Sequence, residues 1–409
     1  MRNICVVLAV TALLTAQGTI TVTTPKESAT LPWQDDTAFA VILKGLSDRG
    51  GGTIAFSAGT FRFDRGVNIQ GIKGITFTGV PGATIWKLRS LDEWGKIKTT
   101  AATKVSDKRL VVDHPELMKV GYRYQAFFDD QRGGRLLEAS VKAIDADGVA
   151  LAFCNATHPN LTEVPAGAYI VPEINFLDGW ALSDITVKGI TMDGGIDPKS
   201  LQVAGKPFTT GHTTHCGLLF RAAYKDRKKK PMGRNIHVED CVFQNLAGRG
   251  FVAYNTEGIT VKKCRFENIR TENCEIDHWS ELAVISDCTF KGGFTGVQLN
   301  DCNGVTVSNC TFEANNVGIF GLDALHDPLT NKNWKIINCT MQNVGKGITL
   351  DGNVQHVDIE RCTFAFAGSP AVDIRGSKIN LRNNVFRDCG KTPWGEPGDR
   401  ATLEGNKVE

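Results

Sequence analysis

The sequence lacks an excess of charge of either sign: 46 Lys and Arg stand against 44 Asp and Glu in 409 residues, a formal net charge of +2. Such a balance gives no overall field that would attract nucleic acid. The 43 glycines follow no three-residue period, which excludes a collagen-like chain and favours a turn-rich fold. We therefore expect no nucleic-acid partner.

The sequence also lacks several motifs of well-characterised chemistry. It has no zinc-type Cys/His spacing, no phosphate-binding glycine loop and no Gly-x-Ser-x-Gly elbow. After residue 18, no hydrophobic run approaches the roughly 18 residues of a membrane-spanning helix. We therefore expect no integral membrane segment in the mature chain. No motif requires a cofactor, and the sequence neither predicts nor excludes a bound Ca²⁺ ion.

Residues 1–18 predict an export signal. Arg2 precedes an apolar run from Ile4 to Leu14, and small residues follow at the spacing of a cleavage site. The run is too short to cross a bilayer core of roughly 30 Å. We therefore expect a secreted protein, extracellular or periplasmic. The alternative is that the run forms a buried strand.

Twelve cysteines would suggest disulfides in an exported protein, but their spacing favours another role. Six recur at intervals of 23, 24, 22, 29 and 23 residues in a Val/Ile-x-x-Cys-x-Phe/Met pattern: Cys241, Cys264, Cys288, Cys310, Cys339 and Cys362. Further copies place Ile190 and Asn384 in the same slot. Because such a slot is typical of a stacked core position, we predict reduced, inward-pointing cysteines. Disulfides or a metal site are the alternatives.

The repeats predict a solenoid. Each holds short strands in which apolar residues alternate with others, for example Gly296–Asn300 and Gly347–Asp351, and no helical period is present. Three short strands in roughly 23 residues are typical of one rung of a parallel β-helix. We predict an all-β fold in which residues 176–409 form about ten rungs.

The N-terminal region carries a resemblance to a known family. Asp35-Asp36-Thr37-Ala38 opens a helical stretch, Gly50-Gly51-Gly52-Thr53 leads into a strand, and Gly59-Thr60-Phe61 follows. This order resembles the start of the pectate lyase superfamily, which implies a right-handed parallel β-helix with an N-terminal capping helix. The superfamily includes polysaccharide lyases, hydrolases, epimerases and phage tailspikes, so the resemblance indicates the fold more sharply than the reaction.

Residues 90–175 interrupt the repeat with strands separated by Asp/Gly turns, which predicts a small β-rich insertion. The insertion would either wall a groove or decorate the surface. The expected division is therefore a signal at 1–18, a cap with the first rungs at 19–89, the insertion at 90–175 and the main coil at 176–409.

The predicted site lies on outward positions of the second strand in each repeat, because the interior is packed. Strand alternation gathers six such residues across four rungs: Arg221, Tyr254, Asp277, Trp279, Gln298 and Asn300. This prediction places Asp277 beside Gln298 in one row and Trp279 beside Asn300 in the other. Such polar and aromatic groups suit a sugar chain, and an ordinary solvated face is the alternative.

The segment from Glu275 to Trp279 departs from the Gly-apolar-x-apolar pattern of the other repeats. Glu275 replaces the expected glycine and stands two residues before Asp277, and Asp301 adds a third carboxylate. Carboxylate pairs are what glycoside hydrolases need. We predict that chemistry centres on Asp277, with a catalytic group completed by Glu275, His278, Tyr254 and Asp301. Alternation alone would point His278 into the core, and a kink at Glu275 would turn it outward.

β-Elimination from a uronate is the other chemistry that this region suits, since it needs a cation or amide and a base. We predict substrate binding by six residues: Arg221, Arg249, Trp279, Gln298, Asn300 and His215. His212 would reach the same face, and the basic run Lys225–Arg234 would attract a polyanion. For both histidines and for the run, the alternative is an ordinary loop.

These features predict a secreted enzyme that cleaves or modifies a polysaccharide, expected to be acidic, as a lyase or a glycoside hydrolase. The alternatives are a uronan C5-epimerase and a non-catalytic coil for glycan binding or surface adhesion. The sequence does not set the oligomeric state.

Overall fold

The computed structural model describes residues 18–89, 96–128, 135–156, 161–197, 202–203, 206–207, 214–222, 233–326 and 330–409. Nearly all of the export signal, His212 and nearly all of the Lys225–Arg234 run lie outside these residues. In the described part of the chain, no helix combines the length and apolar character that crossing a bilayer requires.

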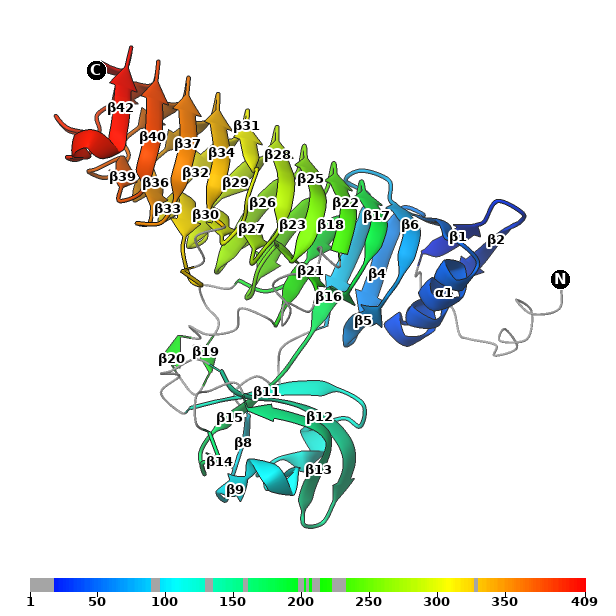
Figure 1. Cartoon of the computed structure of the whole chain (residues 1–409). Helices are drawn as coiled ribbons and strands as arrows, with labels where there is room; N and C mark the ends of the chain where they lie inside the picture. Colours follow the sequence, from blue (N-terminus) through cyan, green and yellow to red (C-terminus); the bar gives the residue numbers. More distant parts are fainter. Residues whose placement is uncertain are drawn as a thin grey trace.

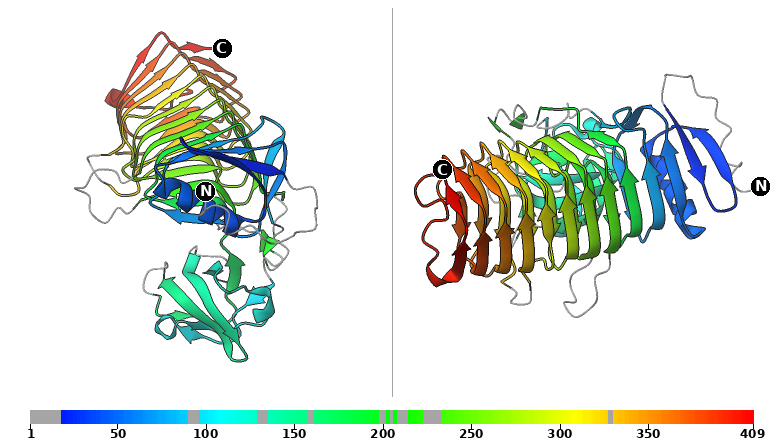
Figure 2. Two further views of the ribbon diagram at one scale, coloured as in Figure 1. Left: turned by 90° about the vertical axis from the view of Figure 1, so that its right-hand side faces the viewer. Right: turned by 90° about the horizontal axis from the view of Figure 1, so that it is seen from above.

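Three long sheets run along one coil, and each rung contributes one strand to each sheet (Figures 1 and 2). We call them sheets 1, 2 and 3 in the order in which the chain meets them within a rung. All their pairings are parallel except those of the first hairpin. In sheets 1 and 2, nine described strands follow residue 176, close to the ten rungs predicted.

Sheet 1 contains β2 (Ser28–Pro32), β1 (Thr19–Thr23), β3 (Gly52–Phe56), β6 (Lys73–Thr78), β17 (Ser183–Lys188), β22 (Gly233–Glu239), β25 (Thr256–Lys262), β28 (Glu281–Ser286), β31 (Thr306–Ser308), β34 (Lys332–Ile337), β37 (Gln355–Glu360), β40 (Ser377–Arg382) and β42 (Ala401–Glu404). Sheet 2 contains β4 (Gly59–Phe63), β7 (Thr84–Leu88), β18 (Thr191–Asp193), β23 (Val242–Leu246), β26 (Arg265–Ile269), β29 (Thr289–Lys291), β32 (Thr311–Glu313), β35 (Thr340–Gln342), β38 (Thr363–Ala365), β41 (Val385–Arg387) and β43 (Lys407–Val408). Sheet 3 contains β5 (Gly66–Gln70), β16 (Asn175–Trp180), β21 (Cys216–Arg221), β24 (Phe251–Tyr254), β27 (Glu272–Asp277), β30 (Thr295–Asn300), β33 (Val317–Leu322), β36 (Lys346–Leu350) and β39 (Val372–Ile374).

Each rung turns at the same position of its repeat, so the repeated residues take the same orientation in every rung. Between sheets 1 and 2, the residue directly before the repeat cysteine is left-handed, as at Asp240 (φ 52°), Lys263 (φ 53°) and Asn309 (φ 54°). The turn aims the next residue inward. All six repeat cysteines are accordingly buried, as predicted, and the structure pairs none of the eleven described cysteines in a disulfide.

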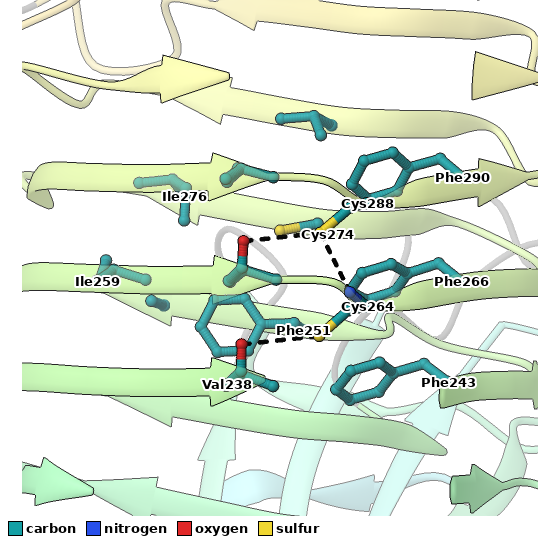
Figure 3. Packing of buried hydrophobic residues seen from close by; sticks show 14 of the residues in the cluster. Val238, Phe243, Phe251, Ile259, Cys264, Phe266, Cys274, Ile276, Cys288 and Phe290 are labelled. Atoms are coloured by element: carbon teal, nitrogen blue, oxygen red, sulfur yellow. Dashed lines mark hydrogen bonds between the residues drawn. The ribbon is translucent and has the colours of Figure 1, made fainter. Parts of the chain in front are cut away.

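Side chains of one kind stack along the interior, where they form ladders (Figure 3). The rings of Phe243, Phe266, Phe290 and Phe312 follow one another with centroids 4.7 to 5.0 Å apart and planes within 15°. The cysteine ladder runs beside them, and Cys264 N–H donates to Cys288 Sγ at 3.4 Å. Register is therefore held from rung to rung by shape as well as by backbone hydrogen bonds.

The N-terminal end of the coil is covered by α1 (Asp36–Asp48), as the resemblance implied. Asp35 caps the helix by accepting a hydrogen bond from Ala38 N–H at 2.7 Å. Phe39, Leu43 and Leu46 on its buried face belong to the coil core. The helix thus closes the apolar interior that the first rung would otherwise expose.

The insertion is a separate β structure with a core of its own. Its antiparallel sheet contains β10 (Arg109–Leu110), β13 (Gly148–Ala156), β12 (Arg135–Asp145), β11 (Arg123–Phe127), β15 (Tyr169–Pro172) and β8 (Ile97–Lys98). A short pair in the insertion joins β14 (Glu163–Val164) to β9 (Thr103–Lys104). A further short pair, β19 (Gln202–Val203) with β20 (Lys206–Pro207), lies outside the insertion, between β18 and β21 in the sequence. Figures 1 and 2 show that the insertion stands off the coil on the side of β5 and β16.

Candidate functional site

The predicted site residues lie mainly on the outer face of sheet 3, but their rows differ from the prediction. Glu275 is paired with Val252 on one side and Gln298 on the other, and Asp277 is paired with Tyr254. Asp277 therefore lies one row away from the row predicted for it. Glu275 does not occupy the glycine slot either, because the register places Asn273 opposite Gly250.

The rung of Asp277 also contains one extra residue, which lies after the end of its sheet 3 strand. A left-handed residue follows Tyr254 directly at Asn255 (φ 45°), and another follows Asn300 directly at Asp301 (φ 49°). In the rung between them, the left-handed residue is Trp279 (φ 58°), two places after Asp277. His278 is thus one residue more than the neighbouring rungs contain. It follows the end of β27, so strand alternation no longer governs it and it does not enter the core, with 18 % of its side chain exposed.

Two buried carboxylates hold the His278 ring. Its Nδ1 lies 2.8 Å from Asp277 Oδ1 and 3.0 Å from Asp301 Oδ2. Asp277 Oδ1 also accepts the backbone N–H of His278 at 2.7 Å, while Asp301 accepts Leu325 N–H at 3.1 Å. Burial alone would lower the pKa of His278, but the two carboxylates raise it to about 10. The ring is therefore an imidazolium at neutral pH.

A second polar group surrounds Arg249 on the neighbouring rung. Its Nε lies 2.8 Å from Glu272 Oε2 and 2.9 Å from Glu275 Oε2, and its Nη1 donates to the Tyr254 hydroxyl at 2.5 Å. Gln298 Nε2 donates to Glu275 Oε1 at 2.7 Å. Burial raises the pKa of Glu275 well above its usual range, although Arg249 opposes the rise. Burial likewise raises the pKa of Tyr254, so the phenol keeps its proton.

Aromatic contacts join the two groups. The ring centroids of Tyr254 and His278 lie 5.9 Å apart, and those of His278 and Trp279 lie 5.8 Å apart. These three side chains are partly exposed, whereas Glu275 and Asp301 are fully buried. A ligand on this face would therefore meet the imidazolium and the aromatic rings before the carboxylates.

The remaining predicted binding residues lie apart or are already engaged. Arg221 Nε donates to Asp178 Oδ1 at 3.0 Å and its Nη2 to Glu173 Oε1 at 3.1 Å, so its guanidinium is held by carboxylates. Asn300 is buried, and its Oδ1 has no hydrogen-bond partner among the described residues. His215 corrects the prediction that its ring reaches this face. It is fully buried, its Nδ1 accepts Ala247 N–H at 3.0 Å, and burial lowers its pKa to about 3.

Sequence reasoning missed several charged residues on the same side of the coil. Asp178 shares a row with Leu219, Val252 and Glu275, so the alternation rule applied one rung earlier would have found it. Glu272 begins the strand that carries Glu275, but alternation would assign it to the inward set of Cys274 and Ile276, so this rule does not find it. Arg123 comes from the insertion and contacts Glu173 at 3.5 Å, and no local pattern signals that contact.

The charge of the site is negative. Around His278 and Arg249, four acidic side chains face two cationic groups: Glu272, Glu275, Asp277 and Asp301 against Arg249 and His278. Because burial favours the protonated form of Glu275, the formal excess is one negative charge. Within the described residues, no three His, Cys, Asp or Glu side chains converge to hold a metal ion.

Comparisons with known proteins agree with this architecture. The family model for a right handed beta helix region matches residues 329–409. An endo-xylogalacturonan hydrolase from Aspergillus tubingensis is 11 % identical, with 91 % of this chain and 88 % of that chain covered and a TM-score of 0.53. A polygalacturonase from Erwinia carotovora is 10 % identical over 90 % of this chain and 89 % of that chain, with a TM-score of 0.49.

The A-module of mannuronan C-5 epimerase AlgE4 from Azotobacter vinelandii is 11 % identical over 91 % of both chains, with a TM-score of 0.45. No curated protein matches the sequence. At such identities the likeness concerns the fold alone. The chain is a right-handed parallel β-helix protein, which confirms the fold predicted from its repeats and its N-terminal resemblance.

Proposed function

We propose that the protein is a secreted glycoside hydrolase that cleaves a polysaccharide at the site formed by Asp277, His278 and Asp301. The observation that carries this proposal is a partly exposed imidazolium held by two buried carboxylates on an acidic outer face. The structural likeness to an endo-xylogalacturonan hydrolase supports a fold on which such chemistry occurs. The reaction itself is argued from the site.

The sign of the charge favours hydrolysis over β-elimination. Glycoside hydrolysis passes through an oxocarbenium-like transition state, which is positive and is stabilised by nearby carboxylates. Elimination from a uronate builds negative charge and needs cations that are free to neutralise it. Here Arg249 is already held by Glu272 and Glu275, and Arg221 by Asp178 and Glu173.

The proposed roles follow from exposure and contacts. His278, with a pKa of about 10, carries a proton at neutral pH and donates it to the glycosidic oxygen. Asp277 lies beside it and stabilises the positive charge that develops on the sugar as the glycosidic bond breaks. A water molecule then adds to the anomeric carbon and gives its proton to His278, which restores the imidazolium. Asp301 acts as a positioning residue, because it is fully buried and fixes the ring through Nδ1. Tyr254 and Trp279 offer aromatic surface to the sugar ring.

A panel of neutral and acidic polysaccharides tests this proposal. The protein should release new reducing ends without the ultraviolet absorbance of an unsaturated uronate. His278→Gln should abolish the release while the protein stays folded by circular dichroism. Appearance of the unsaturated product would show elimination instead. Binding of a polysaccharide with no new chain ends would favour the non-catalytic coil.

A further inference from the structure

A cavity lies between the coil and the insertion, with a volume of about 510 Å³. Its wall combines residues from α1, from β5, from the insertion strands β11 to β13 and from the start of β16. Asp178 in this wall shares its row with the proposed site, but Leu219 and Val252 between Asp178 and Glu275 are fully buried. Within this row, two covered positions thus lie between the cavity and the proposed catalytic site.

The floor of the cavity contains a carboxylate oxygen that lacks a hydrogen bond. The Glu173 side chain is 2 % exposed, and its Oε1 lies 3.1 Å from Arg221 Nη2 and 3.5 Å from Arg123 Nη1. Its Oε2 is buried and has no hydrogen-bond partner among the described residues. Leaving a buried acceptor unsatisfied is unfavourable, so a ligand that donates a hydrogen bond there would gain from doing so.

The charges of the wall select the chemical class of that ligand. An anion entering the cavity would meet the carboxylates of Asp36, Glu173 and Asp178. A cation would meet the guanidinium groups of Arg65 and Arg123. An apolar molecule would leave Glu173 Oε2 without a donor. A neutral molecule with several hydroxyl groups avoids all three conflicts.

The rim adds an aromatic surface. Phe153 on β13 of the insertion lines the cavity, and 44 % of the residue is exposed. Stacking of an aromatic ring against the apolar face of a sugar ring suits such a position. We propose that the cavity binds a neutral sugar residue of a glycan, with its hydroxyls toward Glu173 and one ring face against Phe153. The insertion therefore serves as the wall of a binding site.

Calorimetric titration with neutral disaccharides (cellobiose, xylobiose, lactose and maltose) tests this proposal, with digalacturonate as the anionic counterpart. At least one neutral disaccharide should bind, and digalacturonate should not. Binding should persist in His278→Gln, because the cavity does not depend on the proposed catalytic site. Failure of catalysis and failure of sugar binding are thus separate results.

Two variants test whether the sugar binds in this cavity. Phe153→Ala should weaken binding about fivefold through loss of the ring contact. Ser140→Phe should abolish it by filling the cavity, since Ser140 lines the wall. Phe366→Ala, at another exposed phenylalanine, on the coil, and Lys142→Phe, at an exposed position on β12, should leave it unchanged.

Three results would overturn the proposal. The first is that no neutral disaccharide binds at millimolar concentration. The second is that digalacturonate binds as tightly as the neutral sugars. The third is that Phe153→Ala weakens binding no more than Phe366→Ala does, with both variants folded. Phe153→Ala is a truncation at an exposed position, so it keeps the test valid even where Ser140→Phe fails to fold.

Discussion

The side chains inside the coil repeat from rung to rung, whereas those on the outer face of sheet 3 do not. Inside the coil, each rung repeats the same side chains, as in the phenylalanine ladder of Phe243, Phe266, Phe290 and Phe312. Outside, one row of sheet 3 changes at almost every step: Leu219, Val252, Glu275, Gln298, Phe320, Thr349 and Asp373. Stability is therefore distributed over many equivalent contacts, whereas chemistry depends on residues that occur once.

This separation is a property of solenoids, in which each rung contacts only its neighbours. A change on the outer face leaves the interior ladders intact. The extra residue His278 is an example, since Cys274 and Ile276 of the same rung stay in register with the rungs on both sides. The rung thus gains a functional side chain without losing its place in the stack.

The largest effect should come from breaking a ladder. Phe266 is fully buried and stacked on both sides, so Phe266→Ala should lower the free energy of unfolding by about 3–5 kcal/mol. Denaturant unfolding followed by circular dichroism measures this change. Phe366→Ala, at a residue 61 % exposed, should change it by less than about 0.5 kcal/mol. Equal effects of the two variants would remove the distinction between the faces.

The next largest effect should come from a substitution on the outer face of sheet 3, and it should change activity rather than stability. Asp277→Asn keeps the shape of the side chain and removes the charge beside His278, so kcat on the identified polysaccharide should fall by roughly 10² or more. Thermal unfolding should still be cooperative. Asp351→Asn is the matched control, because Asp351 follows β36 in the same row, two rungs beyond Asn300. A folded Asp277→Asn protein with full activity would show that the site is wrongly assigned.

The same contrast explains how much the sequence could predict. The interior of the coil repeats, so the spacing of its residues predicts the solenoid, the buried cysteines and the strands of sheet 3. The outer face does not repeat, so its residues did not reveal the two-residue slip that placed Asp277 in the row of Val252 and Glu275 in the glycine slot. Contacts such as Arg221 with Glu173 join positions 48 residues apart through the base of the insertion, where no periodicity operates.

A pH experiment examines the carboxylate clamp, by which we mean the ion pairs of Asp277 and Asp301 with His278. The pKa of His278 is about 10 in the folded protein and about 6.5 in an unfolded chain, so folding favours its protonated form. The clamp therefore contributes its full stability below about pH 6.5 and loses it as pH rises through about 10. The melting temperature should fall over this range. His278→Gln should flatten the fall, and an identical slope in both proteins would contradict the ion pairs with Asp277 and Asp301.

The smallest effect should come from restoring the ladder where it is interrupted. Asn384 occupies the cysteine slot, is fully buried, accepts Cys362 N–H at 2.9 Å and donates to the carbonyl of Ile359 at 2.9 Å. Cys288 Sγ accepts Cys264 N–H in the same way, and the cysteine thiols donate to the corresponding carbonyls. Asparagine thus makes the contacts of a cysteine with stronger donors and acceptors.

Asn384→Cys should therefore lower the free energy of unfolding by only about 1 kcal/mol, because sulfur keeps these two contacts in weaker form and loses only the hydrogen bond from Asn384 Nδ2 to Asn406 Oδ1. Asn384→Ala should lower it by more, since Cys362 N–H and the Ile359 carbonyl would both lose a partner while buried. Denaturant unfolding of the two variants side by side measures the difference. If cysteine were as costly as alanine at this position, the slot would not be a general stacking site, and the ladder would depend on the particular residue in each rung.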